Sequence, residues 1–176
     1  MKYFQKITLC LAAIVVMALG NKAVAAAAPG AAFDATGGTD LTVTDSYISG
    51  TITVNDVDIS DGKAVIFTGT HDVSVAMNIE HGLVKVGAGG AKTTQGLTKV
   101  INPAAGVASI LEITAATANC IAGDVEVESG GILQVDDDIP ASGGPFATGA
   151  DLIVHSGAII KLGAGKTWAK DINVVA

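Results

Sequence analysis

The chain has 176 residues, a formal net charge of −7, and ten lysines but no arginine. Because arginine is the side chain best suited to bidentate phosphate recognition, and because an acidic protein repels polyanions, this composition argues against nucleic acid, anionic lipid and polyanionic glycan as partners. The length suffices for one domain with its own hydrophobic core.

Residues 1–25 have the three parts of a secretory signal peptide. Lys2 and Lys6 give a positive start, residues 7–19 are almost wholly apolar, and residues 23–25 (AVA) form a small-x-small cleavage pattern. The apolar stretch is too short for the roughly 20 residues that span a bilayer. We therefore expect export to the cell surface or the extracellular space, with the periplasm as an alternative, and no membrane span after cleavage near Ala25.

Cleavage would leave residues 26–176 with 7 lysines against 17 acidic residues, so the mature chain would be more acidic than the whole. Cys120 would then be the sole cysteine, so no intramolecular disulfide could form. Its neighbours in ATANCIAG are small and mostly apolar, which favours a buried thiol over a bridge between two chains.

Short β-strands are predicted throughout residues 40–176. Residues 26–39 lack periodicity and are expected to be a flexible leader, and residues 40–176 a single domain. Within the domain, runs rich in Val, Ile and Thr alternate apolar with polar residues and are separated by Gly, Asn and Asp. The first expected strands are 41–48, 51–59, 63–69, 72–79 and 83–86.

Three later segments depart from this regular pattern. Residues 106–123 are long enough for a helix, but the β-branched run ILEIT favours a strand plus a loop. Residues 87–96 and 136–149 contain Gly or Pro and are expected to be loops that leave the regular framework.

An internal repeat gives the strongest structural prediction. DVEVESGGILQV (124–135) recurs as DLIVHSGAIIKL (151–162), with weaker copies at 79–90 and 58–67. A repeated strand–corner–strand unit indicates a solenoid in which each rung buries its apolar face on the next. We expect a right-handed parallel β-helix (β-solenoid) of several short rungs, with an antiparallel β-sandwich as the alternative.

Glycines mark the expected corners of the rungs, at Gly62, Gly82, Gly130 and Gly157. The first and last of these intervals suit one turn of a three-sided helix, and the longer middle interval suits two turns. The alternation of side chains along a strand predicts that Glu126, Glu128, Gln134, His155 and Lys161 face solvent. The side chains expected to point inward are Val125, Val127, Leu133, Val135, Leu152, Val154, Ile160 and Leu162.

The pattern V-x-S-G-G-I-L-x-V, in a chain with a signal peptide and much Gly, Ala, Val and Thr, resembles the repeats of bacterial autotransporter passengers and filamentous-haemagglutinin-type adhesins. The resemblance covers residues 58–67, 79–90 and 124–166. It implies a right-handed β-helix displayed on, or released from, the cell surface. It transfers no catalytic residues, and the chain differs from autotransporters in having no room for a C-terminal barrel.

Two motifs invite ligand assignments that their spacing does not support. GAGKT (163–167) has Ile160 where a phosphate-binding loop needs glycine, and the following residues suit a strand, not a helix. The acidic cluster at 55–62 lacks the glycine and glutamate of an EF-hand, with Asp61 and Phe67 in their places. For both acidic clusters, at residues 55–62 and 136–138, a solvated turn is favoured, with weak calcium binding as the alternative.

Histidine and threonine patterns are equally unspecific. His71, His81 and His155 have no metal-ligand spacing, although stacked corners would bring His81 and His155 to one edge. The pairs Thr42/Thr44 and Thr51/Thr53 suggest a threonine ladder, but ordinary strand threonines explain them better. No catalytic, cofactor-binding or metal-binding residue is predicted.

The expected function is that of an exported, non-enzymatic surface or matrix structural protein, with adhesion to a host or matrix glycan or protein as the favoured role. A fimbrial-type β-sandwich subunit that polymerises by strand addition is the alternative. A glycan-acting β-helix enzyme ranks third. The apolar strand at 172–175 has no polar cap, which predicts end-on self-association, a swapped cap, or a longer parent protein.

Overall fold

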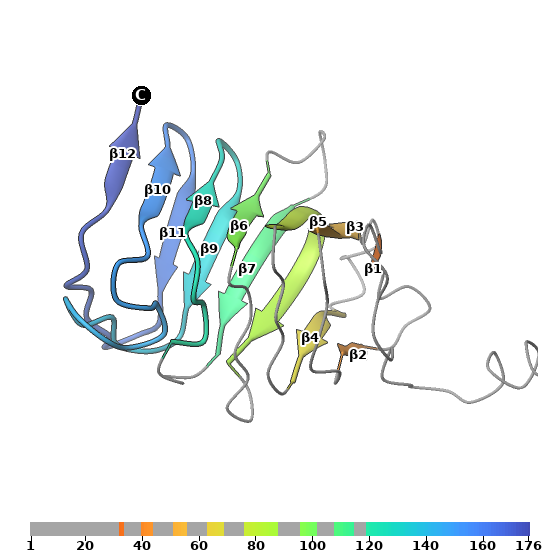
Figure 1. Ribbon diagram of the computed structural model, residues 1–176, viewed down its shortest axis with the longest axis horizontal. Coiled ribbons are helices and arrows are strands. Elements are labelled where there is room, and N and C mark those ends of the chain that lie inside the picture. Colours follow the sequence, from red (N-terminus) through yellow and green to blue (C-terminus); the bar gives the residue numbers. More distant parts are fainter. Residues whose placement is uncertain are drawn as a thin grey trace, which may run out of the picture.

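The computed structural model describes residues 32–33, 40–43, 51–55, 63–68, 76–87, 96–101, 108–114 and 119–176 (Figure 1). Every regular element in these residues is a β-strand. None of them belongs to a helix that could cross a membrane. The predicted signal peptide, Gly62 and the acidic cluster after Asn55 lie outside the described residues, as does the leader apart from residues 32–33.

The strands form two parallel stacks, and the chain alternates between them as it advances along the molecule (Figure 1). Sheet A contains β1 (Ala32–Phe33), β3 (Thr51–Asn55), the first half of β5 (Ala76–Val86), β6 (Leu97–Val100), β8 (Val125–Val127), β10 (Leu152–His155) and β12 (Asn173–Val175). Sheet B contains β2 (Leu41–Val43), β4 (Val65–Phe67), the second half of β5, β7 (Ser109–Ile113), β9 (Ile132–Val135) and β11 (Ile159–Leu162).

All these pairings are parallel, so the predicted parallel β-solenoid is confirmed and the antiparallel sandwich is wrong. The strand predicted within residues 106–123 is also present, as β7. The expected strands at 72–79 and 83–86 prove to be one, because β5 runs through the corner between them and belongs to both sheets.

The register shows that the sequence repeat is one rung. Leu152 pairs with Val125 in sheet A, and Ile160 pairs with Leu133 in sheet B, so each residue lies beside its counterpart in the other copy. The long interval between the corners at Gly82 and Gly130 holds two turns, as predicted, because β7 lies between β5 and β9. At that intermediate corner Ser109 occupies the position that glycine holds at Gly82, its register partner.

The corner glycines are used for their backbone conformation. Gly82, Gly130 and Gly157 have φ of 103°, 83° and 87°, values that L side chains rarely adopt. The amide of Gly130 donates to the carbonyl of Gly157, so one corner hydrogen-bonds to the next. The predicted corners at these three positions are confirmed.

The core is a set of columns of aliphatic side chains that run through the stacked rungs. Inward and outward side chains alternate along β3, β7 and β9. The expected inward positions in β8, β9 and β10 are buried. Ile160 and Leu162 of β11 also face the core, but they are only partly buried, since no strand of the described residues covers β11 from beyond.

A third side closes the solenoid with irregular backbone and two parallel bridges, Ile121 with Phe146 and Ile139 with Trp168. Ile121, Ile139 and Phe146 are almost fully buried, and the rings of Phe146 and Trp168 lie 6.1 Å apart. The interpretation of residues 136–149 as a loop outside the framework was therefore incomplete, because part of this segment forms a wall of the core. Cys120 is buried beside it, as predicted, and burial raises the pKa of its thiol to about 12.

Candidate functional site

The first candidate site is the turn that follows β11. The amide of Lys166 donates to the carbonyl of Gly163, and Gly165 has a φ of 74°. The chain then enters the bridge at Trp168, where a phosphate-binding loop would open a helix. The segment is thus a turn between β11 and the third side, and it has no helical amides to offer a phosphate.

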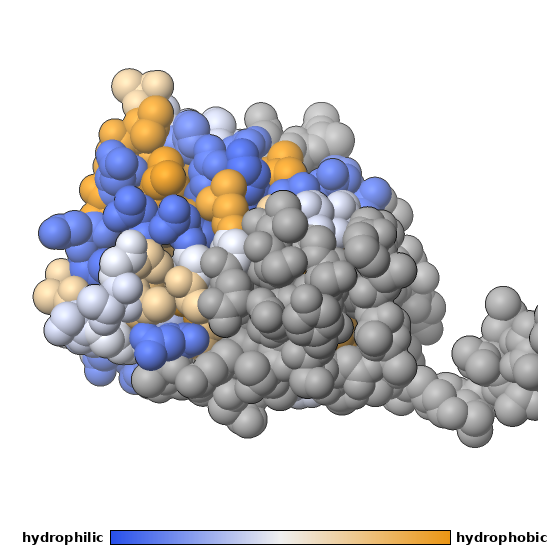
Figure 2. Space-filling model, in the orientation of Figure 1, coloured by the Kyte–Doolittle hydropathy of each residue, from blue (hydrophilic) through white to orange (hydrophobic). Residues whose placement is uncertain are grey.

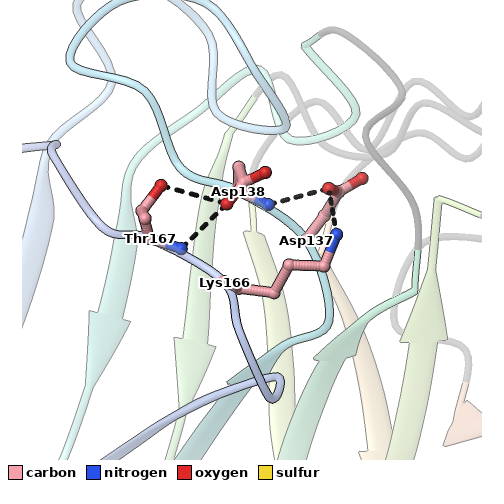
Figure 3. Close-up of polar contacts among 4 residues, drawn as sticks. All are labelled: Asp137, Asp138, Lys166 and Thr167. Carbon is pink, nitrogen blue, oxygen red and sulfur yellow. Dashed lines mark hydrogen bonds and ion pairs between the residues drawn. The ribbon is translucent and has the colours of Figure 1, made fainter.

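This turn is joined to the acidic cluster of the preceding rung (Figure 3). The Nζ of Lys166 lies 3.2 Å from Oδ1 of Asp137. Oδ1 of Asp138 accepts hydrogen bonds from the backbone N–H of Thr167 at 2.8 Å and from its hydroxyl at 3.0 Å. The backbone hydrogen bond from Thr167 lowers the pKa of Asp138. We call these four residues the turn clasp.

The clasp assigns a role to the acidic residues at 136–138, for which the sequence favoured a solvated turn, and joins them to the turn at 163–167. Asp137 and Asp138 lie 29 residues before Lys166 and Thr167, which is close to the offset of 27 that separates Asp124 from Asp151 at the start of the two copies. The carboxylates are thereby used to fasten one rung to the next. Among the residues that the structure describes, no group of three or more His, Cys, Asp and Glu is placed to hold a metal ion.

The second candidate is a row of charged side chains on the outer face of sheet A, one from each of three consecutive rungs. Nζ of Lys99 on β6 lies 2.8 Å from Oε2 of Glu126 on β8. Nε2 of His155 on β10 lies 2.8 Å from Oε1 of the same carboxylate. The hydrogen bond from Lys99 lowers the pKa of Glu126, and the same bond raises the pKa of Lys99. On sheet B, Lys85 and Glu112 form a similar pair at 3.4 Å.

A hollow of about 300 Å³ lies beside this row, lined by Glu128, Ser129, His155, Ser156 and Ala176. Serine, histidine and carboxylate are the groups of nucleophilic catalysis, which needs the histidine between the other two. Here Nε2 of His155 is hydrogen-bonded to Glu126. The hydroxyl of Ser129 lies against Gly157, so that a Cβ added to Gly157 would be 2.5 Å from Oγ of Ser129. Ser129 thus packs against the next corner, and the arrangement suits rung stacking.

The remaining predicted positions are not brought together. His81 lies on β5 and His155 on β10, with β6 and β8 between them, so these two histidines do not share a site. Thr42 is on β2 of sheet B, whereas Thr51 and Thr53 are on β3 of sheet A, so they form no common ladder. Thr44 and His71 lie outside the described residues.

No family model matches this chain, and no match was found among curated proteins or solved structures.

The charged row of sheet A predicts a pH-dependent stability. Because the folded state lowers the pKa of Glu126 below its ordinary value of 4.5, the row stabilises the fold above that pH. This stabilisation is lost as the pH falls through the lower, folded-state pKa. Glu126→Gln should cost about 1 kcal/mol at pH 7, and it should flatten the decline in stability of the wild type below pH 5.

Urea denaturation between pH 7 and pH 3 measures this effect, with Glu112→Gln as the matched control. Glu112 has a single lysine partner at 3.4 Å, so its loss should cost no more than about 0.5 kcal/mol at pH 7. Parallel pH profiles for the wild type and Glu126→Gln would contradict the assignment of the row.

Proposed function

We propose that this chain is an exported, non-enzymatic structural protein of the cell surface or extracellular matrix, which acts as an adhesin by presenting the outer faces of its rungs. The observation that carries the proposal is the use made of its polar side chains. Those of the turn clasp and of the charged row bind side chains of neighbouring rungs. They fasten neighbouring rungs to one another, so the function would lie in the outer surface of the solenoid.

Three further features agree with an exported, non-enzymatic structural protein. The signal-like segment at residues 1–25 favours export, and the acidic charge keeps an extracellular protein soluble. The hollow beside His155 is lined in part by Ser129 and His155, which contact neighbouring rungs. A fimbrial-type subunit of the sandwich class is not proposed, because the parallel stacks exclude the fold on which it depended.

A binding array tests the proposal. The purified protein would be applied to immobilised neutral and sulfated glycans and to the matrix proteins collagen, fibronectin and laminin. We expect saturable binding to a neutral glycan or a matrix protein, and none to the sulfated glycans, since both surfaces are negative.

The mass of each bound glycan, measured afterwards, separates an adhesin from an enzyme. An unchanged mass with saturable binding supports the adhesin. Shortened products would overturn the proposal in favour of a glycan-cleaving β-helix, and an array with no bound ligand would overturn the adhesive role.

A further inference from the structure

The last rung leaves both sheets open. In the described residues, β11 pairs only with β9 and β12 pairs only with β10, so the outer edges of both strands carry backbone groups without a strand partner. Such an edge is a template for another strand. Apolar surface is visible at this end of the molecule, where Figure 1 places β12 (Figure 2).

At this end, the side chains at inward register positions, Val174, Ile160 and Leu162, continue the core. Among the described residues, all four exposed large hydrophobic side chains are in the last rung: Ile159, Ile172, Val174 and Val175. Val174 is 71% exposed, although its register partner Val154 is 8% exposed. In the same way, Ile160 and Leu162 follow the buried Leu133 and Val135. The last rung therefore has the side chains of an internal rung without a neighbour to cover them.

Direction and order favour the first rung of a second copy as the neighbour. The stacks begin with β1 in sheet A and β2 in sheet B, and they finish with β12 in sheet A and β11 in sheet B. Since every pairing is parallel, a copy placed farther along the same axis would set its β1 beside β12 and its β2 beside β11. Both sheets would then continue in the same direction.

Charge favours the same arrangement. Residues 152–176 contain three lysines and one aspartate, although the chain as a whole is acidic. Two last rungs placed face to face would oppose Lys161, Lys166 and Lys170 to their own copies, which disfavours a tail-to-tail contact.

We propose that this chain associates head to tail, with the first rung of one copy stacked on the last rung of the next. The contact continues the parallel ladders of β11 and β12. It also covers the core column that includes Val154 and ends at the exposed Val174. Because the two surfaces are different, the association does not close at a dimer, and it produces rods that lengthen with concentration.

Sedimentation velocity over a wide range of concentration tests this inference on the exported chain, after mass spectrometry has identified its N-terminus. We expect species larger than a dimer whose proportion rises with concentration. A monomer at every concentration, or a dimer that does not grow, would overturn the proposal.

Two neighbouring substitutions on β12 test the contact itself. Val174→Glu places a charge in the emerging core column and should weaken association by about tenfold or more. Asn173→Glu adds the same charge at the next position, paired with the half-buried Ile153 of the outer face, and should change association by no more than about twofold. Equal effects of the two variants, with unchanged circular dichroism, would overturn the assigned surface.

Discussion

Replacing Leu133 with alanine should lower the free energy of unfolding by about 2–5 kcal/mol. The side chain is fully buried in β9, and in sheet B it lies between Leu111 of the preceding rung and Ile160 of the following rung. Its removal takes away apolar contacts and leaves a cavity between rungs that are fixed by two parallel ladders. Urea denaturation followed by circular dichroism measures the loss.

Ile160→Ala is the matched control, because the two residues occupy the same column one rung apart. Ile160 is only partly buried at the open end, so its truncation should cost about 1 kcal/mol. The measurement requires a protein concentration at which the chain is monomeric, since a stacked copy would bury Ile160 as well. Equal losses for the two variants in the monomer would show that the last rung is covered.

This pair of residues also shows why the fold could be predicted from the sequence. Alternation of apolar and polar residues is a local property that assigns Leu133 to the inner face of its strand, whatever lies beyond it. The repeat then supplies the long-range information, because Leu133 and Ile160 hold the same position in the two copies and are also register partners. In a solenoid the repeat offset is the strand register.

The polar contacts of the turn clasp could not be predicted in the same way, because they depend on turns of unequal length. Asp138 and Thr167 are 29 residues apart, whereas the two copies of the repeat are offset by 27. They meet because Thr167 lies farther beyond the end of β11 than Asp138 lies beyond the end of β9. Adding the repeat offset of 27 to the residue numbers of the acidic cluster at 136–138 leads to GAGKT (163–167). The sequence therefore indicates the neighbouring segment, although not the pairs of residues that bind. Lys99 and Glu126, which do keep the repeat offset, could have been found by the same addition.

The third side was the least predictable part of the core. Ile139 and Phe146 are buried in a segment rich in Gly, Pro and Asp that has no alternating pattern. Their partners, Trp168 and Ile121, are joined by single bridges, so no strand-length run marks either position. Tertiary packing places these residues, and the local sequence carries no periodic signal for it.

Gly144→Ala, in this third side, should lower the free energy of unfolding by about 2–4 kcal/mol. The φ of Gly144 is 78°, and a Cβ there would lie 2.7 Å from Cδ and 3.0 Å from Cγ of Pro140. A proline ring cannot rotate out of the way, so the backbone must move. That movement strains the hydrogen bond that the carbonyl of Gly144 accepts from the amide of Asn119 at 2.8 Å.

Gly143→Ala separates the cost of the clash from the cost of the backbone conformation. Its φ is 76°, and a Cβ there would have no atom within 4 Å, so this variant should lose only about 1 kcal/mol. Adding Pro140→Ala to Gly144→Ala should then remove most of the excess loss, since it deletes both ring atoms in the clash. If thermal or urea unfolding gave Gly143→Ala and Gly144→Ala the same loss, the backbone conformation alone would explain both, and Pro140 would not constrain this wall.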